Sequence, residues 1–148
     1  MNTMRRLLFT VLVVALLVGA LAMPASVVAG PPPHVVGQAS QTVYFKPADN
    51  EGLELTIPGV VTLEIPVNAI DPKAKAGDIT VYATVTEEGI QVEIDSKLRK
   101  KDFWGQAVLR FAQPVTSAYE GFNQNDNKRM GGGTEILLDH FSRYSGWF

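Results

Sequence analysis

The stretch LELTIPGVVTLEI, residues 53–65, alternates apolar and polar side chains in two runs that are separated by a Pro-Gly pair. Apolar side chains at every second position give an extended segment one face for a core and one face for solvent. The pair Pro58-Gly59 is typical of a turn between strands. The stretch therefore predicts a β-hairpin made of residues 53–57 and 61–65.

The same alternation recurs on both sides of this hairpin. Apolar residues alternate in 79–85, 90–94 and 107–111, and Glu88-Gly89 is typical of a turn between the first two of these runs. Short strands with regular turn signals and almost no helix indicate a β-sandwich. We therefore expect an all-β fold, a single antiparallel β-sandwich, in which Pro114 ends the sixth strand and 123–133 is a polar, Gly-rich loop. The expected strands are residues 41–45, 53–57, 61–65, 79–85, 90–94, 107–111 and 134–144.

The first 29 residues have the composition of a secretory signal peptide. Arg5 and Arg6 precede an uncharged apolar run over 7–22, and Val27-Val28-Ala29 supplies a small-x-small cleavage site. The alternative is an uncleaved anchor, because 7–29 is close to the roughly 20 residues that span a bilayer. We expect residues 1–29 to be the signal peptide or anchor, 30–40 to be a Pro-rich extended leader, and 41–148 to be the sandwich domain.

Composition limits the classes of partner and site. The chain has no Cys, so the exported domain must be held together by its core rather than by disulfides. The net charge of −2 becomes −4 when Arg5 and Arg6 are removed, which argues against nucleic acid as a partner. His34 and His140 are the only imidazoles, so we expect no metal site and no cofactor.

Two segments resemble a known family. Residues 61–70, VTLEIPVNAI, and residues 78–81, DITV, are similar to the start of ZU-five domains, where an apolar strand runs into Ile-Pro-x-Gly-Ala-Ile and then Ile-Thr-Val. That β-sandwich domain is shared by ankyrins, netrin receptors and zona-occludens scaffolds, with similar modules in bacterial envelope proteins. Asn68 stands where the family usually has Gly, and Asn is the residue that best replaces Gly in a left-handed turn. The resemblance covers roughly Glu51 to Tyr144 and implies a structural or interaction module.

The same resemblance draws attention to His140-Phe141-Ser142. In some ZU-five domains a His-Phe-Ser triplet in a late strand is where the domain cuts its own backbone. In this chain Ser142 Oγ would attack the carbonyl carbon of Phe141 in an N-to-O acyl shift, and water would hydrolyse the resulting ester. A strand would place His140 and Ser142 on one face, where the imidazole could exchange protons with the nucleophile and the leaving amine.

A regular strand, however, separates the Cα atoms of residues 140 and 142 by roughly 6.5 Å, so this chemistry requires a kinked backbone. The alternative interpretation is structural. His140 and Ser142 would then hydrogen-bond their neighbours, and Phe141 would fill the core from the opposite face of the strand.

A second candidate site is the cationic run KLRKK. It places four cations in five positions: Lys97, Arg99, Lys100 and Lys101. Such a cluster can hold an anionic polymer or a lipid headgroup. Charge runs of this kind are also typical of a solvated connection between strands.

Together these features predict an exported, non-enzymatic β-sandwich with a structural or interaction role at the cell envelope. We expect it to be secreted or extracytoplasmic, in a periplasm or at the cell surface, or anchored by its N-terminal segment. Its partner would be another protein or an envelope component, and it would reach a membrane only through an uncleaved N-terminal segment. The alternatives are a self-cleaving domain that cuts the Phe141–Ser142 bond and a binder of anionic ligands through residues 97–101.

Overall fold

The fold was analysed in a computed structural model, which describes residues 35–122 and 128–148. These residues form eight strands and two short 3-10 turns, and the all-β class expected from the sequence is confirmed. The strands and 3-10 turns are β1 (Val35–Phe45), η2 (Pro47–Asp49), β2 (Leu53–Ile57), β3 (Val61–Ile65), β4 (Gly77–Thr86), β5 (Gly89–Asp95), η3 (Lys100–Asp102), β6 (Ala107–Glu120), β7 (Arg129–Leu138) and β8 (Arg143–Trp147).

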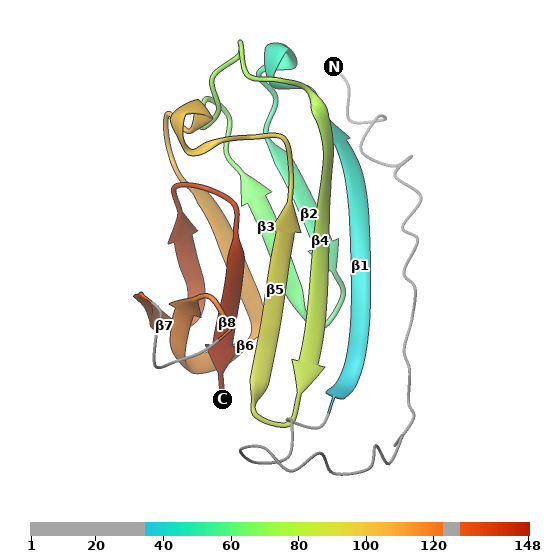
Figure 1. Ribbon diagram of the computed structural model, residues 1–148, viewed down its shortest axis with the longest axis vertical. Helices are drawn as coiled ribbons and strands as arrows, with labels where there is room; N and C mark the ends of the chain where they lie inside the picture. Colours follow the sequence, from blue (N-terminus) through green and yellow to red (C-terminus); the bar gives the residue numbers. More distant parts are fainter. Residues whose placement is uncertain (1–34, 123–127) are drawn as a thin grey trace, which may run out of the picture.

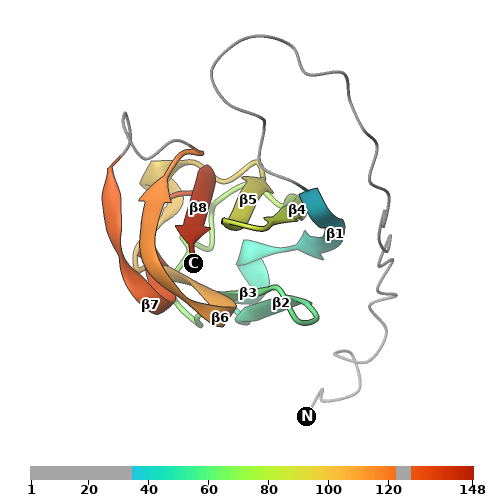
Figure 2. The ribbon, with the colours of Figure 1, turned by 90° about the horizontal axis from the view of Figure 1, so that it is seen from below.

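The strands form one antiparallel sheet that is nearly closed and barrel-like. Its order is β1-β4-β5-β8-β6-β3-β2, and β7 pairs with β6 outside this path. β1 and β2, at the two ends of the order, contact each other without a ladder between their described residues. Figure 1 shows the strands from the side, and Figure 2 shows them arranged around the core. This topology does not confirm the two separate sheets of the expected sandwich.

The hairpin predicted from residues 53–65 is present as β2 and β3. Leu55 lies opposite Leu63, and Ile57 lies opposite Val61. Gly59 adopts a φ of +73°, a left-handed conformation that a residue without Cβ takes at low cost. β3 then pairs with the first half of β6, so that Leu63 also lies opposite Leu109.

The core is one continuous cluster, formed by the inward faces of the strands. The faces predicted from alternation at 61–65, 79–83 and 107–111 are buried there, whereas Val85 is only partly buried. Its members below 2% exposure include Leu63, Ile65, Ile79, Val81, Val92, Ala107, Leu109, Ala118, Leu138 and Tyr144.

Strands β1 and β6 extend well beyond their predicted bounds, whereas β4 and β5 differ from theirs by only one or two residues at each end. β1 begins at Val35 rather than Gln41, because its main chain pairs with β4 from Thr86 onward. β6 continues past Pro114 to Glu120. Its ladder with β7 is irregular between Arg110 and Val115, and an irregular site tolerates a residue that has no N–H to donate.

The irregularity also lets β6 pair with β3 along its first half and with β8 along its second half. β7 follows β6 through its Gly-rich segment. Gly131 and Gly133 have φ angles of +115° and +100°, which L side chains rarely adopt. The expected loop at 123–133 is therefore partly a strand, since β7 begins at Arg129, and residues 123–127 lie outside the described residues.

The last expected strand, 134–144, is wrong as a single element. β7 ends at Leu138, β8 begins at Arg143, and residues 139–142 turn the chain between them. The two strands point in opposite directions in Figure 1. The chain turns because Leu138 pairs with Ala107 at the start of β6, whereas Tyr144 pairs with Glu120 at its end.

The proposed signal peptide or anchor and the start of the Pro-rich leader lie outside the described residues. Within residues 35–122 and 128–148, no helix is both long and apolar enough to cross a membrane.

Candidate functional site

Residues 139–142, which we call the His140 corner, connect β7 to β8 and are fixed by contacts on several sides. The Tyr144 hydroxyl donates a hydrogen bond to the His140 carbonyl oxygen at 2.5 Å. The Phe141 ring packs edge-on against Phe103, with 5.0 Å between centroids. The Ser142 carbonyl accepts the Ile94 N–H at 2.9 Å. A Tyr that bonds the main chain a few residues upstream is a known way of fixing a corner in β-sandwiches.

The imidazole of His140 lies between two carboxylates. Nδ1 is 2.6 Å from Asp139 Oδ1, and Nε2 is 2.6 Å from Glu120 Oε1. Carboxylates only accept hydrogen bonds when ionised, so this arrangement favours the imidazolium, in which both ring nitrogens are donors. The cluster joins the end of β6 to the His140 corner.

The pKa values follow from these contacts. Burial is the largest single influence on His140 and favours its neutral form, but the bonds to Asp139 and Glu120 together outweigh it and raise the His140 pKa. The hydrogen bond from His140, aided by the charge of Lys100, lowers the pKa of Asp139. Burial, followed by the charges of Glu120 and Asp139, raises the pKa of Tyr144 well above its usual value, so its hydroxyl stays protonated.

The geometry differs from the strand expected for self-cleavage. The prediction that His140 and Ser142 share one face of a regular strand is wrong, because residues 139–142 belong to no strand. Both His140 nitrogens are directed at carboxylates rather than at Ser142 Oγ. Phe141 is partly buried and packs against the core, as in the structural interpretation.

The cationic run 97–101, which we call the basic loop, lies beside the His140 corner. Lys100 Nζ is 3.5 Å from Asp139 Oδ2, and Arg99 Nε is 3.9 Å from Asp102 Oδ2. Asp102 is 6% exposed and accepts the Arg99 N–H at 2.7 Å, which fixes the start of η3. Leu98 is also buried, so the main chain of the basic loop is anchored to the core, while its four cationic side chains are exposed, as expected of a solvated connection.

The structure thus places the His140 corner and the basic loop side by side, although the sequence suggested two separate sites. It also adds Glu120, Asp102 and Tyr144, none of which was singled out as a site residue. Tyr144 had a local signal, since it follows His140 by four residues at a strand start. Glu120 had none, because its contact with His140 spans 20 positions and depends on how β6 pairs with β8.

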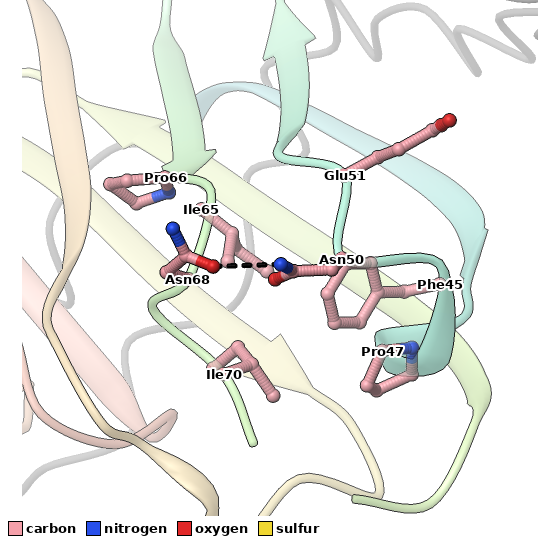
Figure 3. A pocket seen from close by; sticks show the side chains of 8 residues that line it. All are labelled: Phe45, Pro47, Asn50, Glu51, Ile65, Pro66, Asn68 and Ile70. Atoms are coloured by element: carbon pink, nitrogen blue, oxygen red, sulfur yellow. Dashed lines mark hydrogen bonds between the residues drawn. The ribbon is translucent and has the colours of Figure 1, made fainter. Parts of the chain in front are cut away.

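A small hollow lies at the same end of the barrel, where η2 approaches the segment after β3 (Figure 3). Asn50 Nδ2 donates to Asn68 Oδ1 at 2.7 Å across its mouth. The space in it that a water-sized molecule can occupy is about 10 Å³, roughly one water, whereas small-molecule sites usually measure about 300–1,000 Å³. Asn68 has a φ of +65°, the left-handed conformation expected from the sequence.

Among the described residues, no three His, Cys, Asp or Glu side chains are grouped so as to hold a metal ion. No protein-family model matches the chain, and neither the curated proteins nor the solved structures contain a match to it. The resemblance to ZU-five domains therefore stays a prediction.

Proposed function

We propose that this chain is an exported, non-enzymatic β module with a structural or interaction role at the cell envelope. The observation that carries the proposal is the double carboxylate contact of His140. An imidazole whose two nitrogens both donate to carboxylates has no lone pair with which to take a proton from Ser142. The contacts of the His140 corner fit the stabilisation of a chain reversal.

Export and envelope location are supported by the N-terminal pattern of Arg5, Arg6 and the apolar run. The resemblance to ZU-five domains adds the class of module, since most members of that family serve structure or interaction. In this proposal the nearly closed sheet is a β-sandwich whose two layers are joined through the bent strand β6.

Self-cleavage at Phe141–Ser142 is the alternative that the sequence suggested. It would require a free base near Ser142 Oγ and a distorted peptide bond, because resonance keeps an ordinary amide planar behind a barrier of about 18–20 kcal/mol. The Ser142 carbonyl, which lies on the far side of Ser142 from that bond, accepts a main-chain hydrogen bond from Ile94 and so holds Ser142 in the corner. We therefore assign Ser142 a structural part in the corner.

Intact-mass spectrometry under denaturing conditions tests this assignment, because a cut strand could stay paired in the folded protein. We expect one species that extends through Phe148. A species that ends at Phe141, is lost in Ser142→Ala and is slowed in His140→Ala would establish self-cleavage instead. A cut that persists in Ser142→Ala would be the work of a contaminating protease.

Export is tested separately by sequencing the N-terminus of the protein after cell fractionation. We expect material outside the cytoplasm that begins at or near Gly30. Met1 retained in a membrane fraction would replace the cleaved signal by an anchor, and full-length protein in the cytoplasm would contradict export.

A further inference from the structure

The loops that follow β3 and β5 are joined into one surface at the upper end of the barrel in Figure 1. The Asp71 N–H donates to the Asp102 carbonyl at 2.8 Å, and the Trp104 N–H donates to the Ala69 carbonyl at 2.9 Å. Ile70 and Phe103 form a β-bridge between these contacts. We call this surface, residues 66–76 and 96–106, the loop end. Its main-chain bonds hold its side chains in fixed positions relative to the barrel.

Two apolar side chains project from the loop end. Trp104 is 65% exposed and Val67 is 56% exposed, although Ala69 and Ile70 beside them are buried. The chain therefore turns Trp104 outward at a point where its own main chain is anchored to the core. Trp combines a large apolar ring with an N–H donor, and this side chain is enriched at membrane–water interfaces.

The loop end is also the cationic part of an acidic domain. Its two loops contain six Lys and Arg and two Asp, which gives them a net charge of +4. Residues 30–148 as a whole have a net charge of −4, because removing Arg5 and Arg6 lowers the −2 of the full chain by two. Four exposed lysines form no ion pair with a residue that the structure describes; these are Lys73, Lys75, Lys97 and Lys101. Asp71 is occupied with its own loop, where it accepts the Lys73 N–H at 2.9 Å.

We propose that the loop end docks on a membrane surface that contains anionic lipid. The unpaired lysines would contact the headgroups, and Trp104 with Val67 would enter the boundary between headgroups and acyl chains. A soluble polyanion would satisfy the lysines but would give the exposed Trp104 ring no apolar layer, so the membrane fits both observations. The proposal rests on the proposed export, and it adds a lipid contact that does not involve residues 1–29.

Trp104 reports on this contact directly. The chain has two Trp residues, so in a Trp147→Phe background all Trp emission comes from Trp104. The exported protein is mixed with vesicles of phosphatidylcholine alone or of phosphatidylcholine with phosphatidylglycerol. We expect a blue shift and quenching by brominated acyl chains with the anionic vesicles only. Unchanged emission with both kinds of vesicle would overturn the proposal.

Sedimentation with the same vesicles measures separately how much Trp104 and the lysines contribute to vesicle binding. We expect Trp104→Ala, and separately Lys97→Gln with Lys101→Gln, to weaken binding at least tenfold, and high salt to reverse it. The matched controls are Tyr82→Ala, an exposed aromatic on β4, and Lys128→Gln with Arg129→Gln, two cations near the start of β7; these should bind as the parent protein does.

Polyphosphate provides the competing ligand. If it binds as tightly as the anionic vesicles, and Trp104→Ala leaves both affinities unchanged, the loop end is a polyanion site and the membrane proposal fails. If the variants and controls bind vesicles equally, the contact lies elsewhere and the proposal also fails. Neither result affects the intact-mass or N-terminal measurements, so failure here is distinct from failure of the proposed function.

Discussion

The Tyr144 hydroxyl donates a hydrogen bond to the His140 carbonyl oxygen, four residues earlier, at 2.5 Å. Tyr144 itself is fully buried, and its main chain pairs with both Val92 and Glu120. One side chain thus connects the core to the turn between β7 and β8. His140 lies in this turn, so its ring reaches Glu120 from the turn and not from a strand.

Removing the Tyr144 hydroxyl should weaken the corner without emptying the core. We expect Tyr144→Phe to lower the free energy of unfolding by about 0.5–1.5 kcal/mol, the usual net value of one hydrogen bond. Urea denaturation measures the change. Tyr82→Phe, on the exposed face of β4, is the control and should change stability by less than about 0.5 kcal/mol. Equal effects of the two substitutions would mean that the Tyr144 bond contributes nothing to stability.

The His140 cluster should make stability depend on pH. The pKa of His140 is raised in the folded protein, so its contribution is complete below the unfolded value of about 6.5 and is lost as the pH rises through the folded value. The pKa of Asp139 is lowered, so its contribution is present above about 3.9 and is lost as the pH falls through its lowered value. The cluster therefore stabilises the folded protein most between about pH 3.9 and about pH 6.5.

A variant without the titrating ring tests this dependence. We expect the difference in unfolding free energy between the parent and His140→Gln to be largest near about pH 5 and to shrink as the pH rises above about 6.5 and through the raised pKa of His140. Glu120→Gln should reduce the pH dependence, because Glu120 is one of the two carboxylates that hold the imidazolium. Lys100, Asp139 and Tyr144 also face the cluster and remain in both variants. A difference that does not vary with pH would contradict the charged form of His140.

The inward face of β3, which pairs with β2 and β6, gives a third prediction. Leu63 and Leu109 lie opposite each other and are fully buried, whereas Thr62 is on the other face of β3. We expect Leu63→Ala or Leu109→Ala to cost about 2–5 kcal/mol and Thr62→Ala to cost less than about 1 kcal/mol. Thermal or urea unfolding of the three variants measures this. Greater sensitivity at Thr62 would mean that the register is wrong by one residue.

This register could be predicted because it depends on neighbouring residues alone. Alternation over 53–65, with Gly59 at the turn, specifies which side chains of β2 and β3 face inward and which pair. The left-handed φ of Asn68 was expected from the resemblance to ZU-five domains, which usually have Gly at this position, and from the tolerance of Asn for that conformation. Local rules suffice wherever a strand and its turn occur within a few residues of each other.

The bend in β6 and the site at the His140 corner could not be predicted in the same way. Pro114 usually ends a strand, but here it falls at an irregularity that lets β6 pass from β3 to β8. Residues 134–144 were predicted to form one strand, yet Leu138 and Tyr144 pair with opposite ends of β6. The position of Glu120 beside His140 follows from that bend, so no local pattern contains it.

Gly146 provides the last prediction, on the packing of β8 against the bent strand. A Cβ at Gly146 would lie 2.7 Å from Val115 Cγ1 and 3.1 Å from Phe111 Cε1. Val115 and Phe111 are each 4% exposed, so neither can move aside into solvent. We expect Gly146→Ala to cost about 1–3 kcal/mol through overpacking. Gly37→Ala is the matched control, because nothing lies within 4 Å of its Cβ position, and it should be neutral or slightly stabilising.

A double-mutant cycle identifies the cause of the Gly146 effect. Val115→Ala leaves a cavity when made alone, but beside Gly146→Ala the new methyl occupies part of the space that it vacates. The two costs should therefore sum to more than the cost of the double variant, by at least about 0.5 kcal/mol. Strictly additive costs would mean that the added methyl does not press on Val115.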